Sequence, residues 1–265
     1  MKILKPLKDS IRWTKTGTII LSGFLLVIFL IGYVWWPLLE EYISYFDPDA
    51  PFWRQIDWLL LGDFLVMSIL IVLNADLRHD IPFLLIALAG GYIIEAWGTL
   101  SGLWTYYTFE TPPLWIVPAW PIAALSVNRM YTIIRGMTGE VTGKWIRWVY
   151  WTVFGAFYVL LLDFVWPTLS HLLTIFALVV CAVVIITNKD KLSALIVFLA
   201  GSALGYFLER WGTTRECWVY YTGGRPPFFT VLAHGMASVA IWFAYERFLA
   251  IVKQIKKNKL TPEVS

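Results

Sequence analysis

Long apolar runs, separated by short polar or charged segments, follow one another along most of the chain. An α-helix needs about 20 apolar residues to cross the roughly 30 Å hydrocarbon core of a bilayer. The runs approach that length, so the pattern predicts an all-α polytopic membrane protein with about eight transmembrane helices. The expected spans are residues 16–38, 57–75, 81–99, 113–135, 147–166, 169–187, 192–210 and 228–250.

A block in the first half of the chain returns in the second half at a constant spacing. Glu95-Ala-Trp-Gly98-Thr99 corresponds to Glu209-Arg-Trp-Gly212-Thr213, and 209 − 95 = 114. An even number of spans in each unit would give both units the same orientation in the membrane. We therefore predict two tandem four-helix repeats in parallel orientation. The same shift relates Trp104, Tyr106-Tyr107-Thr108 and Pro112-Pro113 to Trp218, Tyr220-Tyr221-Thr222 and Pro226-Pro227.

Lysine and arginine are concentrated in segments that this assignment puts on one side of the membrane. Since such segments stay in the cytoplasm, we expect both termini there and both Trp-Gly segments on the extracytoplasmic side of a prokaryotic cell membrane. The first apolar run follows basic residues and lacks a small-residue cleavage site, which predicts a retained signal-anchor helix. The expected units are a basic tail (1–15), the first repeat (16–135), a cytoplasmic linker (136–146), the second repeat (147–250) and a second basic tail (251–265).

Composition narrows the class of protein further. Hydrophobic residues make up 59% of the chain and charged residues 15%, whereas soluble domains carry about a quarter charged residues. The two cysteines and three histidines form no pattern typical of a disulfide framework or a metal centre. The net charge of +3 is carried by loops and tails. We therefore expect no metal, no cofactor and no nucleic-acid partner.

Five ionisable residues fall inside the expected spans at a similar depth, toward the outer leaflet. They are Glu95, Glu209, Asp63, Asp163 and His234. One such residue alone would often cap a helix or pair with a neighbouring cation, but ionisable groups in a bilayer are costly and are frequently functional. A buried carboxyl can hold a proton at neutral pH, and a second group can collect one. We predict that the two glutamates act as proton donor and acceptor, and that the other three tune or relay protons.

Tryptophan and tyrosine accompany both glutamates. Aromatic residues gather at membrane interfaces in any case, yet an interfacial belt has no need to keep its spacing from an acid in two repeats. We predict a shared aromatic pocket, which would suit an isoprenoid chain, an amphipathic lipid or a quaternary amine, because π faces stabilise positive charge. Its expected residues are Trp97, Trp104, Tyr106, Tyr107, Trp211, Trp218, Tyr220 and Tyr221.

The Glu-x-Trp-Gly-Thr-x-x-Gly segment at 95–102, with the Tyr-Tyr-Thr segment at 106–108, resembles the membrane carotenoid-biosynthesis hydratases. Residues 37–41, Pro-Leu-Leu-Glu-Glu, are more faintly similar to a signature of the small membrane lycopene cyclases. The resemblance implies addition of water across a terminal isoprenoid double bond. Two departures stand out: the segment between Gly102 and Tyr106 is shorter than in the hydratases, and Glu216 replaces the second glycine in the second copy.

These observations favour an intramembrane enzyme that hydrates or cyclises a hydrophobic isoprenoid or carotenoid-like lipid. Its expected partners are that lipid and the bilayer, and the sequence leaves the oligomeric state open. A transporter or binding protein that uses the same cavity, and a non-catalytic membrane subunit, are the alternatives. The second copy carries more polar groups, with His234 at the position of Trp120, so we expect an asymmetric site.

Overall fold

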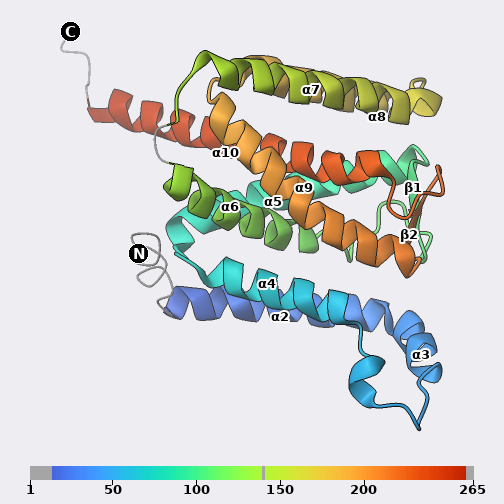
Figure 1. Cartoon of the computed structure of the whole chain (residues 1–265). Coiled ribbons are helices and arrows are strands. Elements are labelled where there is room, and N and C mark those ends of the chain that lie inside the picture. Colours follow the sequence, from blue (N-terminus) through green and yellow to red (C-terminus); the bar gives the residue numbers. More distant parts are fainter. Residues whose placement is uncertain (1–13, 139–140, 261–265) are drawn as a thin grey trace.

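The computed structural model describes residues 14–138 and 141–260, and parts of both expected tails and of the linker lie outside this range. Figure 1 shows three layers of helices. One outer layer contains α2 (Lys15–Val34) and α4 (Trp58–Val72), and the opposite one contains α7 (Lys144–Val165) and α8 (Leu172–Thr187). The central layer contains α5 (Leu77–Leu100), α6 (Ala119–Thr138), α9 (Lys191–Thr214) and α10 (Phe228–Leu260).

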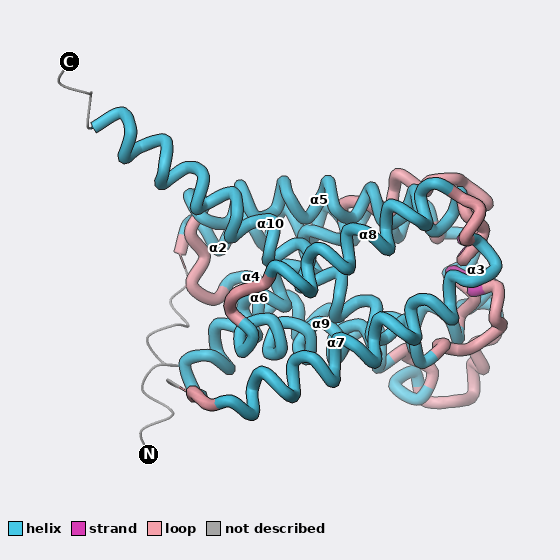
Figure 2. Tube along the Cα trace, turned by 90° about the horizontal axis from the view of Figure 1, so that it is seen from above, coloured by secondary structure: helices cyan, strands magenta, loops and turns pink. Residues whose placement is uncertain are grey.

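Short elements close one end of the bundle. They are α3 (Trp36–Ser44), the 3₁₀ turns η1 (Phe52–Arg54) and η2 (Trp166–Thr168), and the strands β1 (Trp104–Tyr106) and β2 (Trp218–Tyr220). Both ends of the described chain lie at the opposite end of the bundle, where the last turns of α10 extend beyond the other helices (Figures 1 and 2).

Five of the described helices are long and apolar enough to cross a membrane, which supports an integral membrane protein. They are α2, α5, α7 with η2, α9 and α10. The apolar helices α4 and α8 have only 15 and 16 residues. Helix α6 has 20 residues but is less apolar, because it lies in the central layer, where Ser126 and Arg129 are buried against other helices rather than facing lipid.

Several boundaries differ from the expected spans. Helix α6 begins at Ala119 rather than 113, because residues 114–118 form turns after Pro112 and Pro113. Helix α2 ends at Val34, and α3 follows with Pro37 in its first turn, where the missing N–H of proline costs no helical hydrogen bond. Helix α10 continues to Leu260, so the first ten residues of the expected second tail are helical.

Helices α5 and α9 share their bounds at the spacing found in the sequence. Lys191 follows Leu77 by 114 residues (191 − 77), and Thr214 follows Leu100 by the same number (214 − 100). An aspartate caps each helix: the side chain of Asp76 accepts a hydrogen bond from the backbone N–H of Arg78, and Asp190 accepts one from Ser193. Equivalent capping residues therefore begin the two helices at equivalent positions.

Strands β1 and β2 pair in antiparallel orientation, with Thr105 opposite Val219 at the centre. Trp104 lies opposite Tyr220, and Tyr106 opposite Trp218, and the rings of each pair are 5.9 Å apart. The sheet thus brings together the two segments that follow α5 and α9 in the sequence.

Polar contacts join the central helices nearer the end that carries the termini. Arg129 on α6 forms a buried ion pair with Asp80 on α5, at 2.7 Å. The hydroxyl of Tyr131 lies 3.0 Å from the hydroxyl oxygen of Ser193, and Tyr245 donates to the backbone carbonyl of His79 at 3.2 Å. These contacts tie α6 to α9 and α10 to α5.

Candidate functional site

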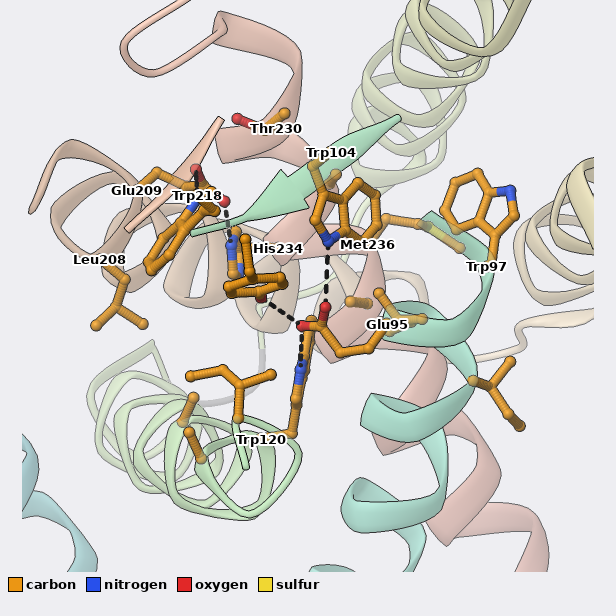
Figure 3. Close-up of a pocket in the computed structure, with 18 of the residues that line it drawn as sticks. Glu95, Trp97, Trp104, Trp120, Leu208, Glu209, Trp218, Thr230, His234 and Met236 are labelled. Atoms are coloured by element: carbon orange, nitrogen blue, oxygen red, sulfur yellow. Dashed lines mark hydrogen bonds and ion pairs between the residues drawn. The ribbon is translucent and has the colours of Figure 1, made fainter. Parts of the chain in front are cut away.

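Glu95 lies in the second-last turn of α5 and is 3% exposed. Its Oε1 accepts hydrogen bonds from the hydroxyl of Tyr106 at 3.0 Å and from Nε1 of Trp120 at 2.9 Å. Its Oε2 accepts one from Nε1 of Trp104 at 3.1 Å (Figure 3). Three neutral donors therefore surround this carboxyl group, and no cation touches it among the described residues.

Glu209 occupies the corresponding place on α9 and is 2% exposed. Nε1 of Trp218 donates to its Oε2 at 3.1 Å, and the hydroxyl of Tyr220 donates to its Oε1 at 2.6 Å. The third contact is different: Nε2 of His234 lies 2.8 Å from Oε1 (Figure 3). An ionisable imidazole thus replaces the indole of Trp120.

Glycines allow these rings to approach the helices that carry the glutamates. A Cβ atom on Gly98 would lie 1.8 Å from Cη2 of Trp104, and one on Gly212 would lie 1.9 Å from Cη2 of Trp218. A Cβ atom on Gly91 would lie 2.3 Å from Cγ of Trp120. The doubled glycines in the sequence are therefore explained by close packing against the ring that binds each acid.

The two glutamate clusters meet at the rings of Trp120 and His234, which stack with centroids 5.7 Å apart and planes 13° apart. An indole N–H can only donate a hydrogen bond, whereas an imidazole can gain and lose a proton near neutral pH. The side chain of His234 is 24% exposed, and its Nδ1 makes no hydrogen bond to any residue that the structure describes. His234 is therefore the member of the site that is best suited to proton transfer.

A cavity of about 320 Å³ borders both clusters and extends between the outer and central layers. Most of its wall is apolar, with side chains from α2, α4, α7, α8 and α10. Sequence reasoning predicted ten of the residues that line it. They are Asp63, Glu95, Trp97, Trp104, Tyr106, Glu209, Trp211, Trp218, Tyr220 and His234.

Three of the predicted site residues lie elsewhere. Asp163 is exposed on α7, because the helical repeat turns it away from Leu161 and Phe164, which do line the cavity. The hydroxyls of Tyr107 and Tyr221 donate to the backbone carbonyls of Val34 and Phe164, at the ends of α2 and α7. These two tyrosines fasten the loops to the outer helices and do not contact the cavity.

Sequence reasoning missed Asp57, which joins the outer layer to the central layer. Its side chain caps α4, and its Oδ2 accepts hydrogen bonds from Nε1 of Trp211 at 2.9 Å and from Nε of Arg215 at 2.8 Å. An aspartate directly before an apolar run is a capping signal that could have identified the first of these roles. The contacts to α9 depend on tertiary structure and left no sequence signal.

We expect Asp57→Ala to lower the free energy of unfolding by about 1.5 kcal/mol, because it removes a helix cap and a charge-assisted hydrogen bond. Unfolding of the detergent-solubilised protein by sodium dodecyl sulfate measures the change. The control is Asp163→Ala at an exposed position, which should change stability by less than about 0.5 kcal/mol. Equal effects of the two substitutions would contradict the role given to Asp57.

No group of three His, Cys, Asp or Glu side chains that could hold a metal ion occurs within residues 14–138 and 141–260. Comparison with family models, curated proteins and solved structures finds no match. The fold and the site therefore define the class of protein: an all-helical membrane protein with a buried acid–aromatic centre beside an apolar cavity.

Proposed function

We propose that the protein is an intramembrane enzyme that binds a hydrophobic, isoprenoid-like lipid and acts on it by proton transfer, in a hydration or a cyclisation. The observation that carries this proposal is the Glu209–His234 pair, which lies on the wall of an otherwise mainly apolar cavity. An apolar ligand would fill the cavity, and the pair would supply the ionisable group that such a ligand lacks.

The proposed reaction begins with a proton from the imidazolium of His234, which Glu209 holds in position. Protonation of a carbon–carbon double bond leaves a carbocation, and the ring faces of Trp104, Trp120 and Trp218 are suited to stabilise it. In a hydration, the oxygen of a water molecule bonds to the cation and its surplus proton returns to the imidazole. In a cyclisation, a second double bond attacks the cation and a neighbouring C–H proton is lost instead.

Glu95 would contribute negative charge on the other side of the stacked rings. Its carboxyl group accepts three hydrogen bonds from neutral donors. A carboxylate at this place would stabilise a passing carbocation and could receive the proton that a cyclisation releases. The two glutamates would therefore have different functions despite their similar contacts.

We also propose that all eight of the longer helices cross the membrane, as two tandem four-helix repeats with both termini in the cytoplasm. The equal bounds of α5 and α9 and the matching contacts of the two glutamates support the repeat. Lys144 and Lys191 begin α7 and α9, and Lys189 lies in the connection between α8 and α9. These helix starts lie at the same end of the bundle as the termini (Figure 1), which supports the orientation. At 15 and 16 residues, α4 and α8 would require local thinning of the bilayer.

The test is to express the full chain in cells that make carotenoids and polyprenyl lipids, and to compare lipid extracts by mass spectrometry with cells that carry an empty vector. A product heavier by one water molecule supports hydration, and a product of unchanged mass but different retention supports cyclisation. The Glu95→Gln/Glu209→Gln double variant should form neither. Unchanged lipids together with proton-dependent uptake of a solute would contradict the enzyme and support a transporter. Unchanged lipids without uptake would favour a non-catalytic subunit.

A further inference from the structure

Asp63 is a buried acid on the wall of the cavity, and the protein gives it no hydrogen-bond partner. It lies in the second turn of α4 and is 8% exposed. Leu60, Phe64 and Met67 line the same cavity, so this side of α4 faces it. Neither carboxyl oxygen of Asp63 forms a hydrogen bond with a described residue. Oδ2 is enclosed, which leaves Oδ1 as the oxygen that a ligand in the cavity would meet.

Asp57, at the start of α4, shows how an acid of the same segment is satisfied by the protein itself. It caps the helix and accepts hydrogen bonds from Trp211 at 2.9 Å and from Arg215 at 2.8 Å. Asp63 has no counterpart to these donors among the residues that the structure describes. Since an unpaired buried acceptor lowers stability, its place on a cavity wall indicates a ligand that donates a hydrogen bond.

The other polar residues of the cavity restrict the charge of that ligand. Carboxyl groups of Asp63, Glu95 and Glu209 line it, and no lysine or arginine does within residues 14–138 and 141–260. The imidazole of His234 is already in contact with Glu209. An anionic end group at Asp63, such as a phosphate or a carboxylate, would therefore lack a cation to pair with, and buried charges are normally paired.

We propose that Asp63 binds the polar end group of an otherwise apolar lipid, and that this end group donates a hydrogen bond. A hydroxyl group and an ammonium group both donate to a carboxyl oxygen, whereas an ether oxygen only accepts and a hydrocarbon does neither. The residues of α2 and α4 that line the cavity beside Asp63 are apolar and would contact the chain of the lipid. The inference thus names the chemical class of the ligand: a long-chain, isoprenoid-like alcohol or amine.

The second repeat has no equivalent of Asp63, which gives the ligand a direction. Helices α4 and α8 begin 114 residues apart (172 − 58), and at this shift Asp63 corresponds to Ala177. Ala177 also lines the cavity, together with the apolar residues Phe176 and Val180. The polar end of the lipid would therefore lie against α4, and its apolar chain would extend toward α8.

This inference rests on the proposed function in one respect, namely that the cavity takes up a lipid. It does not require turnover, so binding is the appropriate measurement. Full-length protein in phosphatidylcholine nanodiscs is incubated with tritium-labelled farnesene, a hydrocarbon that needs only the apolar wall, and unlabelled compounds compete with it. Farnesol and farnesylamine should each compete about fivefold better than unlabelled farnesene, the effect of one buried hydrogen bond. Farnesyl methyl ether keeps the oxygen but has no hydrogen to donate, so it should compete no better than farnesene.

Substitutions assign the preference to Asp63 and distinguish the two end groups. Asp63→Leu removes both oxygens and should abolish the advantage of farnesol and of farnesylamine. Asp63→Asn keeps an accepting oxygen without a negative charge, so farnesol should keep its advantage while farnesylamine loses most of its own. Asp163→Leu, at an exposed acid on α7, is the matched control and should behave like the unmodified protein.

Three results would overturn the inference: equal competition by all four compounds in the unmodified protein, an ether that competes as well as farnesol, or an undiminished preference in Asp63→Leu. An advantage of farnesol alone or of farnesylamine alone supports it and identifies the end group. If Asp63→Leu does not elute as a folded protein, the smaller Asp63→Ala takes its place. Selective binding by a protein that leaves all lipids chemically unchanged would disprove the proposed reaction and leave this site standing. Product formation without any preference for a donor would do the reverse.

Discussion

Replacement of His234 by phenylalanine is expected to lower the rate of product formation by at least about a hundredfold, because a positioned general acid or base contributes roughly 10²- to 10⁴-fold to a rate. Phenylalanine keeps an aromatic ring against Trp120 and removes the group that exchanges a proton. The measurement is the initial rate of product formation in membranes, determined by liquid chromatography and mass spectrometry at matched protein amounts.

The chain provides a control for this prediction at the equivalent position of its first half. Trp120→Phe removes the hydrogen bond from Nε1 to Glu95 but no titrating group, so the rate should fall less than about tenfold. If the two variants were equally impaired, the stacked rings would act through packing alone. If His234→Phe kept a third or more of the rate, a different residue would have to supply the proton.

Gly98→Ala is expected to destabilise the protein by about 3 kcal/mol, the upper end of the usual range for overpacked cores. The new methyl group would occupy the space of the Trp104 ring, three atoms of which lie within 2.1 Å of the added Cβ position. The ring would have to move, and its hydrogen bond to Glu95 would be lost. Unfolding by sodium dodecyl sulfate, followed by circular dichroism, measures the loss of stability.

Gly155→Ala on α7 is the matched control, because nothing lies within 4 Å of a Cβ atom added there. Alanine in a helix interior is more favourable than glycine, so this variant should gain about 0.5–1 kcal/mol. Gly212→Ala should behave like Gly98→Ala, since its added Cβ would lie 1.9 Å from the Trp218 ring. If Gly98→Ala or Gly212→Ala left stability unchanged, the neighbouring tryptophan ring could be displaced without cost.

Sequence reasoning predicted the site residues that occur in both halves of the chain. A residue that keeps its spacing from an acid in two copies is less easily explained by its place at a membrane interface alone. Glu95 and Glu209 keep their distances from a glycine and two aromatic residues, and the structure shows the reason: the glycines make room for rings that bind the acids. The apolar runs predicted eight helices, and the structure has a helix at each of these places. Five of the eight have the length and composition expected for a membrane span.

Residues that occur once were harder to place, since their roles depend on helix rotation and on neighbours distant in sequence. Asp163 has the depth expected of a site residue but lies on the outward side of α7. Trp35 follows an apolar run and precedes Trp36-Pro37, a context typical of the membrane interface. Its ring lies on the cavity wall and packs against Trp115 and Trp211, which are distant in sequence. Asp57 and Trp211, which form a hydrogen bond, are separated by 154 residues in the sequence.

The contacts of the two glutamates have a consequence for how the chain enters the bilayer during synthesis. Every side chain that hydrogen-bonds to Glu95 lies within 25 residues of it in the sequence, and the same holds for Glu209. An unpaired carboxyl in hydrocarbon is costly, but each acid here can gather its partners from its own helix–strand–helix segment. Glu95 can thus form all of its hydrogen bonds before the ribosome has made the second half of the chain. Neither half depends on the other to provide hydrogen-bond partners for its glutamate.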